Sequence, residues 1–295
     1  MSAEAVSARV PLPLTIGKRT VARLHRRLVR LSMPLEQALA GEPLLLPGLP
    51  PQADGYYLRA IPAGQVDELA RASGMRSFVR QSYPRHFADL GPGFEAYLGT
   101  FSPKSRSGLK RKRRKLEERC GGELDVRLYR GASEIEGFYR QARALSALTY
   151  QERLLDAGLP EGALDEMRAL AGEDRVRAWL LFVDNDPVSY LYAPGTGATL
   201  RYAYLGYDPA FADLSPGTVL QLEAMRMLME EGRFRWFDFT EGDGQHKRQF
   251  ATSAIDSLDL MLLRPSIGNY AATSALAGFD RAVGLAKRIV HAARR

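Results

Sequence analysis

Four side chains that could take part in acid–base or electrostatic catalysis lie close together between residues 236 and 251. They are Asp238, Glu241, His246 and Lys247. Carboxylates and imidazole can act as general bases, and a lysine can stabilise a developing oxyanion or position a substrate. Each also has a purely structural interpretation, since an aspartate can cap a turn and a lysine can be a surface charge. The segment is therefore the first candidate for a catalytic site.

The residues before this segment have the pattern of a strand, a loop, a helix and a second strand. Residues 202–207 alternate in character, residues 218–229 are apolar at helical spacing on more than one face, and residues 234–240 are β-rich. Such a βαβ unit has parallel strands and a right-handed crossover, and ligands bind beyond the carboxyl ends of the strands. We expect the loop before the helix and the Glu241–Lys247 turn to lie at that end.

The loop before this helix is a candidate site for a phosphate. The N–H groups that begin a helix lack partners within it, and the helix dipole favours an anion there. The residues predicted to bind a cofactor in this way are Ser215, Gly217, Thr218 and Val219.

A second candidate binding region is the basic run within residues 102–120, where six basic residues follow one another from Lys110 to Lys115. On a helix, Leu109, Arg113, Leu116 and Cys120 would form a narrow apolar seam. The run is either a solvated helix face or a phosphate-binding surface. No aromatic residue is interleaved with the charges, which argues against nucleic acid.

Four residues outside the catalytic segment are predicted to contact the substrate. Three belong to the basic run, and the fourth lies on the 202–207 strand, where a core position is the alternative. They are Lys104, Arg106, Lys110 and Tyr204.

Composition limits the remaining possibilities. The 295 residues carry a net charge of +7, with an isoelectric point near 9.5, which favours an anionic partner such as a phosphorylated molecule, nucleic acid or a membrane surface. The single Cys120 excludes an internal disulfide and favours a reduced, cytoplasmic compartment. Four scattered histidines predict no metal site. No apolar run approaches the ~20 residues of a membrane-spanning helix.

The first part of the chain is predicted to be partly irregular. We expect disorder over residues 1–17, an amphipathic helix with a basic face over residues 18–40, and a proline-rich linker over residues 41–55. Residues 56–101 then form a partial α/β subdomain. Its expected elements are strands at 56–61 and 76–83, a helix at 66–72 and a helical turn at 94–98.

The rest of the chain alternates strands and helices. The expected elements are a strand at 123–129, helices at 133–145 and 160–170, a hairpin at 176–183 and 188–192, and a strand at 258–263. Residues 266–295 form a separate terminal segment, with a basic amphipathic helix from residue 276.

The order of hairpin, third antiparallel strand, helix and parallel strand resembles the GNAT N-acetyltransferase fold. The chain resembles more narrowly the CelD-like branch, associated with cellulose and exopolysaccharide synthesis and related to the Fem-type aminoacyl transferases. The residues that carry this resemblance are those at 94–98, 102–112, 215–217, 237–242 and 246–251. The fold class implied is α/β (α+β), with a GNAT-like mixed sheet over residues 102–265, helices on both faces, and a smaller degenerate GNAT-like half before it.

The resemblance also implies a cofactor and a role for one residue. Acyl-CoA would be the co-substrate, with its pyrophosphate at the start of the central helix, and Lys247 is similar to the lysine that Fem-type enzymes place at the acyl centre. Three features depart from the pattern. Residues 211–218 keep only Gly217 of the usual glycines, His246 or Gln245 stands where an aromatic residue is common, and Ala251 replaces a glycine.

Three functions follow from these patterns. The first is an acyltransferase that moves an acyl group from acyl-CoA to a sugar, a polysaccharide precursor or a cell-envelope metabolite. The second is a Fem-type ligase that uses aminoacyl-tRNA, with the basic run holding RNA. The third is a non-catalytic protein that binds anionic membranes through its basic helices. We favour the first, because the βαβ unit and residues 237–251 agree on it.

Overall fold

The computed structural model describes residues 6–16, 19–148 and 158–293, and it divides into two compact units. Unit 1 comprises residues 1–83 and 256–295, and unit 2 comprises residues 84–255. The chain passes between them within strands β4 (Arg76–Asp89) and β11 (Ser253–Leu263). The boundaries expected at residues 55, 101 and 265 differ from this division, because the last residues of the chain fold with the first.

Unit 2 contains a mixed sheet in the order β4-β10-β8-β7-β6-β5, with β9 also paired to β7. Its other strands are β5 (Asp125–Tyr129), β6 (Val176–Val183), β7 (Asp186–Thr196), β8 (Thr199–Arg201), β9 (Tyr204–Tyr207) and β10 (Trp236–Asp238). Its helices are α3 (Phe94–Gly99), α4 (Pro103–Arg119), α5 (Ile135–Leu148), α7 (Leu164–Gly172), the 3-10 helix η2 (Pro209–Leu214), α8 (Pro216–Glu231) and α9 (Gln245–Phe250).

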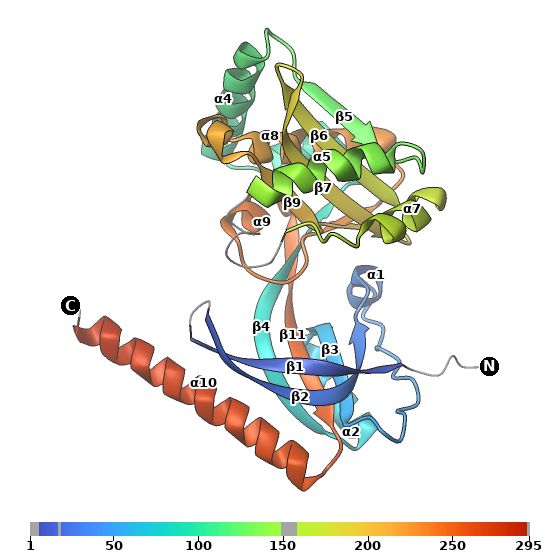
Figure 1. Cartoon of the computed structure of the whole chain (residues 1–295), viewed down its shortest axis with the longest axis vertical. Coiled ribbons are helices and arrows are strands. Elements are labelled where there is room, and N and C mark those ends of the chain that lie inside the picture. The colour runs from blue at the N-terminus through green and yellow to red at the C-terminus, as the bar shows by residue number, and fades with distance from the viewer. Residues whose placement is uncertain (1–5, 17–18, 149–157, 294–295) are drawn as a thin grey trace. The chain divides into compact units, whose positions relative to one another are not determined.

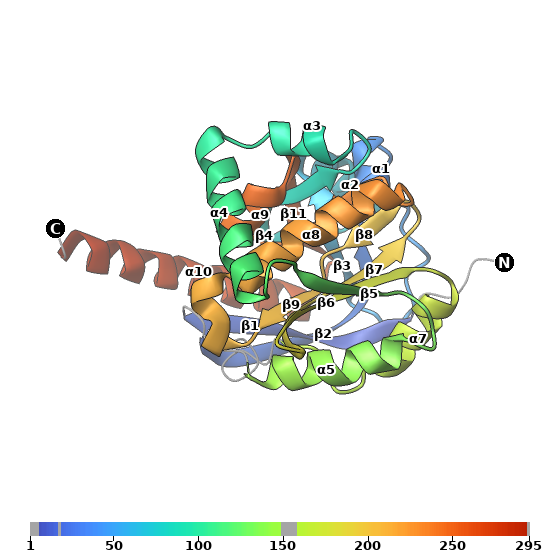
Figure 2. The same ribbon diagram turned by 90° about the horizontal axis from the view of Figure 1, so that it is seen from above.

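Helices cover both faces of this sheet because both faces of its central strands are apolar. Trp179 and Leu181 of β6 lie in one core cluster with residues of α4 and α8, whereas Ala178 and Leu180 lie in another with residues of α5 and α7. Figures 1 and 2 show α8 and α5 on opposite sides of the strands. The predicted mixed sheet with helices on both faces is confirmed. The parallel partner of β10 is β8, at residues 199–201, just before the strand expected at residues 202–207.

The strand expected over residues 202–207 is interrupted. Thr199 pairs with Thr196 and Tyr204 pairs with Tyr192, so five steps along β8 and β9 correspond to four along β7. The extra residue is a β-bulge at residues 202–203. Only β8, before the bulge, pairs with β10. The sheet therefore splays open between β9 and β10.

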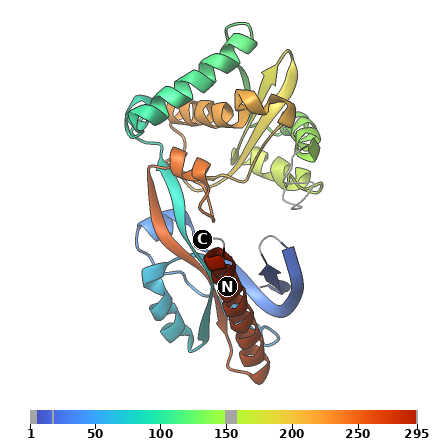
Figure 3. The ribbon, with the colours of Figure 1, turned by 90° about the vertical axis from the view of Figure 1, so that its left-hand side faces the viewer.

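Unit 1 contains strands in the order β1-β2-β3-β11-β4. The remaining bounds are β1 (Ser7–Ile16), β2 (Arg19–Ser32), α1 (Leu35–Leu39), β3 (Gly55–Pro62), η1 (Ala63–Gln65), α2 (Val66–Ser73) and α10 (Ile267–Ala293). One face packs Leu276 of α10 against Val10, Leu12 and Leu28, and the other packs α2 through Leu69. In Figure 3, α10 and α2 lie on opposite sides of these strands.

Two predictions for the beginning of the chain are wrong. Residues 7–16 form β1 where disorder was expected, and residues 19–32 form β2 where a helix was expected. The helical pattern rested on Val21, Leu24, Leu28 and Leu31, which are three or four residues apart. The spacing of four between Leu24 and Leu28 also keeps side chains on one face of a strand. Pairing with β1 and β3 buries Leu28 and Val29 on the two faces of the sheet.

Two further properties concern the described residues as a whole. No helix among them combines the length and hydrophobicity that a bilayer-spanning segment needs. They also contain no group of three or more His, Cys, Asp or Glu side chains arranged to hold a metal ion.

A substitution at Gly206 of β9 tests how closely this strand packs against Tyr190 of β7. A Cβ atom added at Gly206 would lie 2.5 Å from the ring of Tyr190. We expect Gly206→Ala to lower the free energy of unfolding by about 1–3 kcal/mol, because a well-packed core resists added volume. Gly137→Ala is the control, because a Cβ there meets nothing within 4 Å in α5. That variant should gain up to about 1 kcal/mol from helix propensity. Equal urea midpoints for the two variants would contradict the packing described.

Candidate active site

A pocket of about 470 Å³ opens in unit 2 where β9, η2, α8 and α9 meet; we call it the α8 pocket. It lies beside the splayed part of the sheet. Its described lining contains no aspartate, glutamate, lysine or arginine. The lining residues are Tyr202, Leu205, Gly206, Tyr207, Pro209, Ala212, Gly217, Thr218, Gln221, His246 and Phe250.

The β-bulge determines that Tyr202, and not Tyr204, lines this pocket. Tyr202 packs against Phe237, Phe239 and His246, with ring centroids 6.4, 6.0 and 5.6 Å apart. Tyr204 instead stacks on Tyr192 within the cluster under α5, on the other face of the sheet. The extra residue places the two side chains on opposite faces, which an unbroken strand would not do. Tyr202 therefore lines the pocket, and Tyr204, the predicted substrate contact, does not.

Gln221, on the second turn of α8, is the most unusual residue of the lining. Only 3% of its surface is exposed, and neither Nε2 nor Oε1 has a hydrogen-bond partner among the described residues. Leaving a buried amide unpaired costs about 1–3 kcal/mol per unsatisfied group. The pocket therefore offers an incoming ligand one hydrogen-bond donor and one acceptor. Nothing in the sequence distinguishes Gln221 from an ordinary helical glutamine.

The turn after β10 is fixed by a buried ion pair. Arg85 of β4 donates from Nε and Nη2 to the two carboxylate oxygens of Asp238, at 3.2 and 2.7 Å. The Asp238 and Arg85 side chains are 5% and 7% exposed, and Asp238 also accepts the Thr240 N–H at 2.8 Å. Both carboxylate oxygens are therefore engaged in holding the turn. Asp238 is poorly placed for the role of general base predicted for it.

A second carboxylate, Asp243, holds the outer part of the same turn. Its two oxygens contact His86 Nε2 at 2.9 Å and Arg248 Nη1 at 2.6 Å. These contacts lower the pKa of Asp243, with His86 as the larger cause. Arg85 and His86 are more than 150 residues earlier in the chain than their partners, so no local pattern in the sequence could connect them to the turn.

Lys247 is buried on α9 rather than exposed. Its Nζ donates to the backbone carbonyl of Glu241. Burial lowers the pKa of Lys247, and the charges of Glu241 and Asp238 partly oppose that shift. Glu241 itself is exposed. Neither Lys247 nor Glu241 belongs to the described lining of the α8 pocket.

His246 is the one predicted catalytic residue in the described lining of the pocket. The residue is exposed overall, yet its ring lies against Tyr202. Partial burial lowers the pKa of the imidazole, and the charge of Lys247 lowers it further. The ring is therefore unprotonated at neutral pH, which is the form that accepts a proton.

The start of α8 is less open to an anion than the sequence suggested. Ser215 adopts a left-handed conformation with φ of 54°, and its carbonyl accepts the N–H groups of Thr218 and Val219 at 3.0 and 3.2 Å. Pro216 has no N–H. The cradle of free N–H groups predicted at Thr218 and Val219 is therefore absent. Gly217 and Thr218 do line the pocket, whereas Ser215 and Val219 are outside its described lining.

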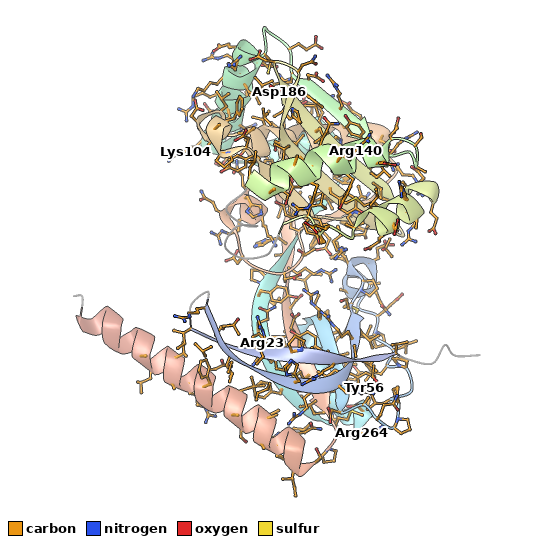
Figure 4. The ribbon with its side chains drawn as sticks, in the orientation of Figure 1. Arg23, Tyr56, Lys104, Arg140, Asp186 and Arg264 are labelled. Atoms are coloured by element: carbon orange, nitrogen blue, oxygen red, sulfur yellow. The ribbon has the colours of Figure 1, made fainter. Side chains whose placement is uncertain are left out.

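The predicted substrate contacts on α4 are also outside the described lining. Lys104, Arg106 and Lys110 are exposed, and Figure 4 labels Lys104 at the beginning of α4. The part of α4 that reaches the pocket wall is its other end, where Lys115 Nζ contacts Asp213 of η2 at 3.0 Å. Eleven residues of helix, about 16 Å along the axis, separate Lys104 from Lys115. Arg113 also pairs with Glu223 of α8 at 2.7 Å, so part of the basic run holds helices together.

Part of the chain matches a known protein family. Residues 103–248, slightly less than half of the chain, match the family model described as the acetyltransferase (GNAT) domain, and this match supports an acyltransferase. No curated protein sequence matches the chain significantly.

Two solved structures share its fold at low sequence identity. One is the C-terminal domain (DUF2156) of a protein assigned as a lysylphosphatidylglycerol synthetase from Agrobacterium fabrum. It is 13% identical with a TM-score of 0.53, and the match covers 77% of this chain and 71% of that one. The other is FemX, 11% identical with a TM-score of 0.52 over 86% and 88% of the two chains.

The Arg85–Asp238 pair gives a test of what holds the turn. We expect Asp238→Asn to lower the free energy of unfolding by about 3–5 kcal/mol, because it leaves a buried guanidinium without its counterion. The double variant Arg85→Met with Asp238→Asn should recover most of that loss in chemical denaturation. A loss below about 1 kcal/mol for Asp238→Asn, the size expected of an exposed pair, would refute this account.

Proposed function

We propose that this acyltransferase moves an acyl group from acyl-CoA to an amine or hydroxyl of a sugar, a polysaccharide precursor or a cell-envelope metabolite. The observation that supports acyl-CoA is the uncharged α8 pocket, whose lining includes His246. The pantetheine arm and acyl group of acyl-CoA are uncharged, and their carbonyl and N–H groups can pair with the Gln221 amide. We infer the saccharide acceptor from the CelD-like resemblance. We infer a cytoplasmic location from the single cysteine, which favours a reduced compartment.

The same pocket disfavours an aminoacyl donor. The α-ammonium of an aminoacyl group needs a carboxylate or several acceptors when it is buried. The described lining offers no carboxylate. The fold shared with FemX still supports the aminoacyl-tRNA alternative. The thermal unfolding experiment below distinguishes the two donors.

We assign proton transfer to His246. The acceptor nucleophile attacks the thioester carbonyl carbon as the imidazole removes its proton. The carbon–sulfur bond then breaks, and the proton passes to the departing CoA thiolate. Lys247 holds the Glu241 carbonyl and thereby positions the loop before α9. Its predicted role at the oxyanion, and the roles of Glu241 and Asp238 as bases, remain alternatives that substitution can test.

Thermal unfolding with acetyl-CoA, longer acyl-CoAs and free CoA tests the donor. A ligand at a hundred times its dissociation constant adds about 2.7 kcal/mol, which raises the melting temperature by a few degrees. Gln221→Leu should keep or raise the melting temperature without ligand, because it removes an unpaired buried amide, and should reduce the shift with acyl-CoA. Gln141→Leu on α5 is the matched control and should leave the shift unchanged. No shift at saturating acyl-CoA would refute the proposal and favour aminoacyl-tRNA, whose binding would weaken steeply with salt.

The pH dependence of the reaction tests His246. Because the pKa of His246 is lowered from 6.5, the unprotonated base is available at and above neutral pH. We expect kcat/KM to stay level near pH 7 and to fall only as the pH drops below 6.5. His246→Gln should lose this acidic limb together with about a hundredfold or more in rate. An acidic limb that survives the substitution would assign the base to another group.

A further inference from the structure

Unit 1 contains a second cavity, of about 650 Å³, which we call the unit 1 cavity. Residues from β1, β2, β3, β4 and α10 converge on it. The polar side chains that carry the argument are Arg30, Tyr57, Arg80 and Asp280. All belong to unit 1, so the cavity is independent of the α8 pocket.

Arg80 is a mostly buried cation that this unit pairs incompletely. Its side chain is 13% exposed, and its Nη2 donates to the Pro13 carbonyl at 3.3 Å. Its Nη1 is buried and has no hydrogen-bond partner among the described residues, because the Asp280 carboxylate lies 3.6 Å away. A buried charge is costly unless it is both paired and hydrogen-bonded. An anion entering the cavity would supply the missing acceptor.

Arg30 adds a second positive charge to the same wall. It lies opposite Tyr57 in the pairing of β2 with β3, and it is exposed. Within the described part of the chain it makes no ion pair or hydrogen bond. Burial and the Asp259 carboxylate raise the pKa of Tyr57, and the charges of Arg59, Arg80 and Arg30 partly oppose this shift. The Tyr57 side chain therefore lies within the field of three guanidinium groups and one carboxylate.

The net charge of the described lining indicates that the ligand is an anion. Two arginines face one carboxylate, so the cavity has a net positive charge. Guanidinium groups bind the oxygens of phosphate in a forked geometry, and the Tyr57 hydroxyl can donate a further hydrogen bond. The cavity is also much larger than a phosphate ion, which leaves room for the molecule that carries it.

We propose that the unit 1 cavity binds the phosphate group of a phosphorylated ligand between Arg30 and Arg80. The phosphate can belong to a soluble compound such as a sugar phosphate or to an anionic lipid headgroup. In both cases its oxygens accept hydrogen bonds from the two guanidinium groups, and Asp280 weakens binding by repulsion. This site does not depend on the function proposed for the α8 pocket.

The proposal is tested by titrating the full chain with inorganic phosphate and with glucose 1-phosphate in a calorimeter. Sedimentation with vesicles of phosphatidylglycerol, compared with phosphatidylcholine, tests the lipid source. Arg80→Gln and Arg30→Gln should each weaken binding about tenfold or more, because each removes a charged hydrogen-bond donor. Asp280→Asn should strengthen it, because the competing carboxylate is removed. Arg23→Gln is the control of equal charge change on β2, outside the described lining, and should bind as the wild type does (Figure 4).

The outcomes separate clearly. Binding of glucose 1-phosphate with this pattern of variants supports the site and a soluble ligand, and the same pattern with phosphatidylglycerol vesicles alone supports it and a lipid. Circular dichroism of each variant shows whether it folds, and Arg30→Gln alters an exposed residue, so its result stands if Arg80→Gln unfolds. Absence of binding in every arm overturns the proposal. Equal weakening by Arg23→Gln also overturns it, because the binding would then follow overall charge.

Discussion

The extra residue between β8 and β9 is the constraint on which the binding site of unit 2 depends. Without it, β9 would continue beside β10, and Tyr202 and Tyr204 would face the same way. Because of the extra residue, β10 pairs with β8 and not with β9. Tyr202 lies beside His246, whereas Tyr204 packs in the cluster under α5. Ligands of open α/β sheets bind in a crevice outside the carboxyl ends of the strands.

The charged side chains of the candidate site lie outside the described lining of the α8 pocket. Asp238 is held by Arg85, Asp243 by His86 and Arg248, and Lys247 by the Glu241 carbonyl. These contacts join β4, β10 and α9, and they leave an uncharged pocket whose polar groups are neutral. An enzyme that handles an uncharged thioester needs such a pocket with a base in its lining, and His246 is a residue of the lining that can act as a base.

The sequence predicted the βαβ unit well, because a buried helix stopped by Gly232 and two flanking β-rich runs are local patterns. The catalytic role of residues 236–251 stays a prediction, and of its four candidate catalytic residues His246 belongs to the described pocket lining. Prediction from the sequence failed where distant residues decide the outcome. The strand at 19–32 depends on pairing with β1 and β3, and the bulge depends on register with β7. Gln221 became notable only when its amide was found buried and unpaired.

The most direct test of the account is release of free CoA thiol from acetyl-CoA, followed with a thiol reagent in the presence of a panel of amino sugars and hydroxyl sugars. The account predicts thiol release that requires both the protein and an acceptor, with one acylated product formed for each thiol released. It also predicts that His246→Gln nearly abolishes this release. Absence of acceptor-dependent thiol release across the panel, together with transfer of an aminoacyl group from aminoacyl-tRNA to the same acceptors, measured as formation of the aminoacylated product, would contradict it.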